Sequence, residues 1–136
     1  MHRWKNTFLV GVACVLLAAC AVTRIFRDPL HRDLDESLTI VTLIKDPKKY
    51  LNKEIVISVR YGEKGTLPCP LEGEYVNIII KDRVSYIAFD KVWMKETKAD
   101  ELEKFKANDT VVMRVKVFRI DKEKEPNLEV LEIAPE

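Results

Sequence analysis

Histidine and glycine are scarce in this chain, and several kinds of catalytic site depend on them. The two histidines are His2 and His31, so residues 38–136 contain none and cannot build a serine–histidine–acid triad. The three glycines after residue 20 all fall between residues 62 and 73, without the spacing of a phosphate-binding loop. We therefore expect a domain that is not an enzyme.

Cysteine is equally rare. Cys14 and Cys20 lie at the apolar amino terminus, which leaves Cys69 as the one thiol of the remaining chain. A single thiol cannot form a disulfide within its own domain, so the hydrophobic core must stabilise the fold. Zinc sites need clustered cysteine and histidine, which residues 38–136 lack. We expect neither a metal ion nor a cofactor.

An excess of charge of one sign is also missing. When Arg3 and Lys5 of the leader are set aside, 21 basic residues face 22 acidic ones. A nucleic-acid-binding protein normally has a clear basic excess, because neutralising phosphates supplies most of its affinity. The balance of charge therefore disfavours nucleic acid as the partner.

The amino terminus has the zones of a signal peptide. Arg3 and Lys5 precede an apolar run from Thr7 to Ala19, 13 residues long. As a helix this run is about 20 Å long, well short of the roughly 30 Å hydrocarbon core of a bilayer. Its length therefore favours a cleaved leader, residues 1–19, over a permanent span.

The leader ends in Leu17-Ala18-Ala19-Cys20, which resembles the lipobox of bacterial lipoproteins. The resemblance implies that a signal peptidase recognises Leu17, Ala18 and Ala19 and cuts before Cys20. It also implies that the Cys20 thiol carries diacylglycerol and that its amino group is acylated. Each buried methylene contributes about 0.8 kcal/mol, and two chains anchor a protein stably. The alternative is an uncleaved signal anchor.

A lipid on Cys20 predicts a place in the cell. We expect a protein held at the cell membrane or the outer membrane, with its domain facing the periplasm or the cell exterior. In bacteria with two membranes, aspartate after the lipidated cysteine resembles the signal for inner-membrane retention. This chain has Ala21 there, which favours the outer membrane.

Residues 20–37 are predicted to be the lipidated cysteine and a tether. Charged residues interrupt any apolar face from Ala21 to Ser37. The alternative is a segment docked on the membrane or on the domain through Ile25, Phe26 and Leu30. Residues 38–136 are then the folded domain.

Alternating apolar and polar residues predict five strands in that domain. A short helix opening at Asp46-Pro47 precedes them, and a second helix with a capping box at Thr97 and Asp100 runs to about Ala107. A change of phase after Val130 indicates a bulge in the last strand. The predicted strands are Glu54–Tyr61, Tyr75–Lys81, Val84–Asp90, Thr110–Ile120 and Leu128–Ile133.

Three strands, a helix and two strands form the order of the oligonucleotide/oligosaccharide-binding (OB) fold, a five-stranded Greek-key barrel. The segment before and within the first strand also resembles OB domains of bacterial lipoproteins and tRNA-anticodon-binding-like domains. Asn52 stands where those domains usually have glycine, and Val59 stands where a second glycine often bends the strand. The residues that carry the resemblance are Ile40, Leu43, Ile44, Asp46, Pro47, Tyr50, Lys53, Ile55 and Ile57.

The loop from Gly62 to Glu74 joins the first two strands, where OB folds commonly bind ligands. It contains Cys69, which is either a reactive thiol or an inert small residue. Aromatic residues on OB strands stack on sugars or bases, so Tyr75 and Tyr86 are candidate ligand-binding residues. Trp93 and Met94 are expected to plug the barrel, and the charged turn 121–125 to be solvated.

The sequence thus predicts a lipid-anchored, non-catalytic binding module of the cell envelope. A protein or another envelope component is the first candidate partner. An oligosaccharide- or nucleic-acid-binding module and a purely structural spacer are the alternatives.

Overall fold

The computed structural model describes residues 29–136. The predicted leader, its recognition residues Leu17, Ala18 and Ala19, and the predicted lipidation site Cys20 lie outside the described residues. Of the described helices, none is both long enough and apolar enough to span a bilayer.

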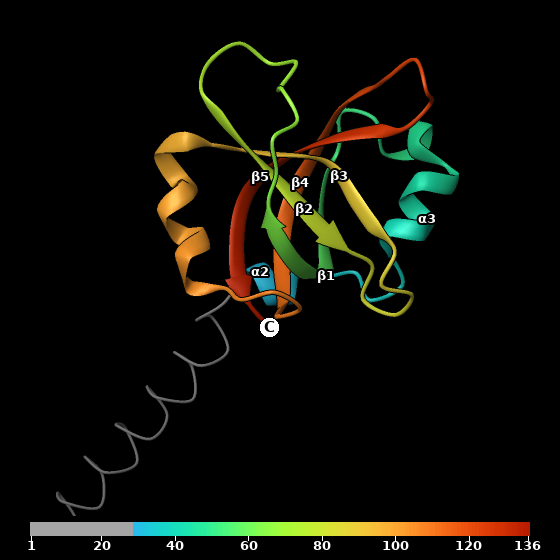
Figure 1. Ribbon diagram of the computed structural model, residues 1–136. Helices are drawn as coiled ribbons and strands as arrows, with labels where there is room; N and C mark the ends of the chain where they lie inside the picture. Colours follow the sequence, from blue (N-terminus) through green and yellow to red (C-terminus); the bar gives the residue numbers. More distant parts are fainter. Residues whose placement is uncertain (1–28) are drawn as a thin grey trace, which may run out of the picture.

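Five strands close into a barrel in the order β1-β2-β3-β5-β4 (Figure 1). All neighbouring strands are antiparallel except β3 and β5, which are parallel. The 3-10 helix η2 (Glu96–Lys104) connects β3 to β4. This strand order, with a helix after the third strand, is the OB fold. The strands are β1 (Glu54–Lys64), β2 (Tyr75–Lys81), β3 (Ala88–Lys95), β4 (Thr110–Ile120) and β5 (Pro126–Pro135).

Alternation of apolar residues builds the core. Along β4, Val111, Met113, Val115 and Val117 are fully buried inside the barrel, as the sequence predicts. The predicted bulge in β5 is confirmed, because Arg114 pairs with Glu132 and Val115 with Val130, which leaves one extra residue on β5. The bounds of β2 and β4 agree with the prediction.

The third strand is the largest error of the sequence prediction. It was expected at Val84–Asp90 and runs from Ala88 to Lys95. The reason lies in Asp82, whose carboxylate accepts hydrogen bonds from the backbone N–H groups of Val84 and Ser85 at 3.1 and 2.9 Å. These bonds hold a turn, and its apolar residues mimic the alternation of a strand.

In similar OB domains a glycine at the position of Val59 often bends the first strand. Here the irregularity of the first strand lies at Gly62 instead. The pairing of β1 with β2 shifts register between Tyr61 and Glu63. A Cβ atom on Gly62 would lie 2.5 Å from the backbone oxygen of Ile79, so only glycine fits this close approach. The strand therefore coils around the barrel without a glycine at residue 59.

Helix η2 lies where the second helix was predicted but is built differently. It begins at Glu96, one residue before Thr97, and no side chain caps it. Its Ala99 and Leu102 are buried against the barrel. The helix thus depends on tertiary packing and not on the predicted capping box.

Short helices precede the barrel. The 3-10 helix η1 (Pro47–Tyr50) starts with proline, as predicted, and Asn52 has the expected left-handed backbone (φ 63°). Helix α3 (Ile40–Lys45) was not predicted; Thr39 caps it, and Ile40 and Leu43 reach the core.

Residues 29–37 are docked on the barrel and do not form a free tether. Helix α2 (Pro29–Arg32) places Leu30, 4% exposed, against Val56 and Val112. Asp33 accepts a hydrogen bond from the Arg114 guanidinium at 2.8 Å. Of the two alternatives for residues 21–37, docking on the domain therefore describes this part, whereas Ile25 and Phe26 lie outside the described residues.

Candidate ligand-binding site

The loop between β1 and β2, residues 65–74, folds back over the barrel. Asn77 on β2 is buried and holds it: its Oδ1 accepts the Leu67 N–H at 3.1 Å. Its Nδ2 donates to the carbonyls of Asp90 (2.7 Å) and Val92 (2.9 Å) on β3. A Cβ atom on Gly65 would lie 2.1 Å from Asn77 Oδ1. One amide side chain thus joins the loop to two strands.

Trp93 lies beneath this loop. Its indole Nε1 donates to the Leu67 carbonyl at 2.9 Å, its ring contacts Phe118 at a centroid distance of 6.1 Å, and it is 2% exposed. The expectation that Trp93 and Met94 plug the barrel holds only for Met94, which is part of the interior core. Successive residues of a strand point to opposite faces, so Trp93 faces outward and the loop covers it.

The charged turn 121–125 between β4 and β5 is fixed by an ionic cluster, which we call the Lys91 cluster. The ammonium of Lys91 on β3 lies 2.6 Å from Asp121, 3.0 Å from Glu123 and 3.6 Å from Glu125. Asp121 also accepts the N–H groups of Glu123 and Glu125 and the side-chain amide of Asn127. The sequence predicted a solvated turn, and this prediction is wrong: ion pairs and hydrogen bonds fix the turn to β3 and β5.

Both central groups of the Lys91 cluster are poorly exposed, Lys91 at 14% and Asp121 at 9%. Burial alone would lower the pKa of Lys91, but hydrogen bonds to Asp121 and Glu123 outweigh it and raise that pKa. Burial likewise acts to raise the pKa of Asp121, yet the bonds from Lys91, the Glu125 N–H and Asn127 lower it to about 2. Both groups stay charged at neutral pH.

A hollow of about 360 Å³ lies between the β1–β2 loop and the β4–β5 turn. We call it the rim hollow. Its loop side is apolar, and its turn side carries charges of both signs. It is lined by Leu67, Pro68, Cys69, Pro70, Lys91, Trp93, Arg119, Asp121, Lys122, Glu123 and Asn127.

Cys69 lines the rim hollow and is partly buried. Burial raises the pKa of its thiol, and the Leu71 N–H, 3.4 Å from Sγ, only partly offsets this. A raised pKa keeps the thiol protonated at neutral pH, and the protonated form is a poor nucleophile. Of the two interpretations of Cys69, an inert residue is therefore favoured over a reactive thiol.

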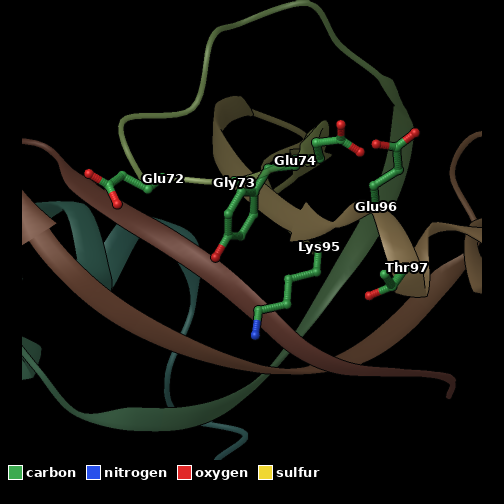
Figure 2. A pocket seen from close by; sticks show the side chains of 7 residues that line it. Glu72, Gly73, Glu74, Lys95, Glu96 and Thr97 are labelled. Atoms are coloured by element: carbon green, nitrogen blue, oxygen red, sulfur yellow. The ribbon is translucent and has the colours of Figure 1, made fainter.

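Tyr75 lines a second hollow, of about 480 Å³, between the end of the same loop, residues 72–74, and residues 95–97. Figure 2 shows the Glu74 and Glu96 carboxylates pointing toward one another, whereas Lys95 extends in a different direction. A side-chain hydrogen bond with Glu74, together with the negative charge of that carboxylate, raises the pKa of Glu96. We call this the acidic hollow; Glu72, Gly73 and Thr97 complete its lining.

Two of the three predicted ligand-binding residues lie near one another, although they line different hollows. Cys69 and Tyr75 are electrostatic neighbours, and both lie near Glu129 on β5. Tyr86 is at the opposite end of the barrel, because β2 runs from Tyr75 to Lys81 between them and Lys81 pairs with Ala88. The Arg60 guanidinium stacks 4.6 Å from the Tyr86 ring centroid. Tyr86 therefore belongs to neither hollow.

Sequence reasoning missed Lys91, Arg119 and Asn127. Arg119 donates from Nε to Asn127 Oδ1 at 2.8 Å, and Asn127 in turn contacts Asp121. The available signal was Asp121 at the start of a turn, where its carboxylate can accept backbone N–H groups. Within residues 29–136, no three histidine, cysteine, aspartate or glutamate side chains are grouped so as to hold a metal ion.

No protein-family model and no curated protein matches the sequence. Similar solved structures include a chain assigned as an aspartyl-tRNA synthetase from Leishmania major Friedlin, at 11% identity and a TM-score of 0.47. That match covers 64% of this chain and spans only 18% of the synthetase chain.

Two OBody chains, each bound to hen egg-white lysozyme, are also similar. AM1L10 is 21% identical with a TM-score of 0.44, over 64% of this chain and 81% of its own. AM3L09 is 17% identical with a TM-score of 0.46, over 74% of this chain and 94% of its own. The fold assignment itself rests on the strand order of the barrel.

Proposed function

We propose that this protein is a lipid-anchored, non-catalytic binding module of the bacterial envelope. In this proposal the lipid on Cys20 holds it at a membrane, and the rim hollow contacts another protein or an envelope component. The observation that carries the binding role is the rim hollow itself, whose two walls are fixed by Asn77 and by the Lys91 cluster. Fixed walls lower the ordering cost of binding.

The lining of the rim hollow fits a protein surface. Leu67, Pro68 and Pro70 offer apolar contact on one wall, and Arg119, Lys122 and Glu123 offer charges on the other. Protein interfaces combine an apolar centre with a polar rim in this way. The charges of the rim hollow are mixed, Asp121 and Glu123 against Lys91, Arg119 and Lys122, and do not form the strongly basic surface that nucleic acid requires.

An oligosaccharide is the second candidate ligand, and the acidic hollow favours it. Carboxylates accept hydrogen bonds from sugar hydroxyls, and a tyrosine ring offers a face for stacking. Tyr75, Glu72, Glu74 and Glu96 supply both kinds of group in one place. The two candidates therefore use different parts of one loop, residues 72–74 and residues 67–70, and can be separated by experiment.

The anchor is tested by the substitution Cys20→Ser. We expect complete loss of palmitate labelling and accumulation of the uncleaved precursor in growing cells, because serine lacks the thiol that takes the diacylglyceryl group. Cys69→Ser is the matched control, since it removes the other thiol of the mature chain and should leave labelling unchanged. Labelling that persists in Cys20→Ser would rule out the proposed anchor.

The binding role is tested by a photo-crosslinking amino acid placed at Lys122 in the rim hollow, at Glu72 in the acidic hollow, or at Lys104 on η2. We expect a discrete protein adduct from Lys122, and none from Lys104, in intact cells. An adduct from Glu72 that a glycan-degrading enzyme removes would instead favour the oligosaccharide. Equal products from Lys122 and Lys104 would contradict binding at the rim hollow.

A further inference from the structure

The turn between β2 and β3 displays the three most exposed large hydrophobic side chains of the described residues. Val84 is 78% exposed, Ile87 53% and Tyr86 51%, whereas the next two, Leu51 and Leu67, are 38% and 37% exposed. We call Val84, Tyr86 and Ile87 the apolar tip. Single exposed hydrophobic residues are ordinary, but a cluster marks a contact surface.

The apolar tip stands on a rigid turn. The Asp82 carboxylate accepts the N–H groups of Val84 and Ser85, and the Asp82 N–H donates to the Ile87 carbonyl at 2.8 Å. Tyr86 has a left-handed backbone, φ 61°, which costs a bulky residue energy. These hydrogen bonds fix the backbone of the turn, which leaves Val84 and Ile87 more than half exposed and Tyr86 half exposed, with one side of its ring against Arg60.

The tip lies at the end of the barrel where the described chain begins. Arg83, within the turn, forms an ion pair at 3.3 Å with Glu136 at the carboxyl terminus. Ala134, two residues earlier, packs against the apolar cluster that contains Leu30 of α2. Figure 1 shows α2, the carboxyl terminus and the β2–β3 turn at one end of the barrel, with the β1–β2 loop and the β4–β5 turn at the other.

Nine residue steps separate Cys20 from Pro29. Fully extended, nine steps span at most about 30 Å. We propose that the apolar tip inserts into the interface of the bilayer that carries the Cys20 lipid, so that the domain has two points of membrane contact. This inference rests on the proposed anchor at Cys20.

A lipid surface fits the tip better than a protein does. Specific protein interfaces use about 20–30 residues a side, and the tip has three. Tyrosine is enriched at membrane interfaces because its ring is apolar and its hydroxyl is polar. The charges beside the tip are of both signs, Arg60 and Arg83 against Asp82 and Glu136, so insertion of the apolar side chains and not attraction to anionic lipid must supply the contact.

Tryptophan fluorescence can test the insertion, because Trp93 is the only tryptophan after residue 19. The mature lipoprotein is reconstituted in phosphatidylcholine vesicles with brominated acyl chains, as wild type, as Val84→Trp and as Leu67→Trp. We define the added emission of a variant as its fluorescence minus that of wild type, which comes from Trp93. We expect the bromine atoms to quench the added emission of Val84→Trp at least twofold. Leu67→Trp is the matched control, a partly exposed leucine at the opposite end, and its added emission should be unquenched.

Salt distinguishes insertion of the tip from electrostatic adsorption of the domain to the vesicle surface. At about 0.5 M salt surface charges are screened, so the quenching of Val84→Trp should persist if the tip is inserted. Absent quenching, equal quenching of both variants, or loss of quenching in salt would each overturn the inference. Mass spectrometry of Cys20 in the same sample tests the anchor separately. A lipidated Cys20 with an unquenched Val84→Trp overturns insertion alone, and an unmodified Cys20 overturns both proposals.

Discussion

Replacing Lys91 with alanine should lower the free energy of unfolding by about 3 kcal/mol, because breaking a buried ion pair leaves an uncompensated charge. Asp121 would keep its burial but lose its closest cation, 2.6 Å away, and Glu123 and Glu125 would repel it. Urea unfolding followed by circular dichroism at pH 7 measures the change. Lys122→Ala removes an exposed lysine of the same turn and should change the free energy by less than about 0.5 kcal/mol.

The effect of Lys91 should depend on pH. The pKa of Asp121 is lowered to about 2 from an ordinary value of 3.8, so its contribution to stability is complete above pH 3.8 and is lost as the pH falls toward 2. A shift of this size corresponds to about 2 kcal/mol. Wild type should therefore lose this stability between about pH 4 and pH 2, and Lys91→Ala should lose much less. Parallel acid profiles of the two proteins would contradict the account.

Asn77→Ala should be about as destabilising, by about 3 kcal/mol, because it removes one buried and two partly buried hydrogen bonds. The Leu67 N–H and the carbonyls of Asp90 and Val92 would lose their side-chain partner. A buried polar group without a partner costs about 1–3 kcal/mol. For a domain of this size the melting temperature should fall by more than about 10 °C, measured by circular dichroism.

The same substitution should also release the β1–β2 loop and expose Trp93. We expect the fluorescence of Trp93 to shift to longer wavelength in the folded protein, because its Nε1 bond to Leu67 depends on a loop that Asn77 fixes. Thr66→Ala, an exposed change in the same loop, is the control and should leave both readouts unchanged. An unshifted spectrum in Asn77→Ala would show that other contacts hold the loop.

Strands with one buried face could be predicted from the sequence, since alternation of apolar residues gives their extent directly. The bounds of β4 are recovered in full for this reason. The same signal placed the third strand several residues early, because Val84 and Tyr86 stand on either side of Ser85 at alternate positions of what is a turn. Helix α3, only six residues long, has too few turns for its period to stand out.

The site was less predictable than the fold. Glycine and proline marked the β1–β2 loop, so Cys69 and Tyr75 were found from local sequence. The Lys91 cluster joins residues about 30 positions apart, and its pairing follows from the parallel contact of β3 with β5. Local patterns carry no information on such a contact. Tyr86 was misplaced for the same reason, because its distance from Tyr75 depends on where β3 begins.

The two ends of the barrel have different uses if the proposals hold. β2 alone, seven residues long, has a length of roughly 20 Å, and it separates the Tyr75 end from the Tyr86 end. A molecule standing on its lipid and its turn would carry the rim hollow at about that height above the headgroups, facing away from the bilayer. Its reachable partners would be soluble or wall-bound molecules in the aqueous space, and not proteins buried in the lipid.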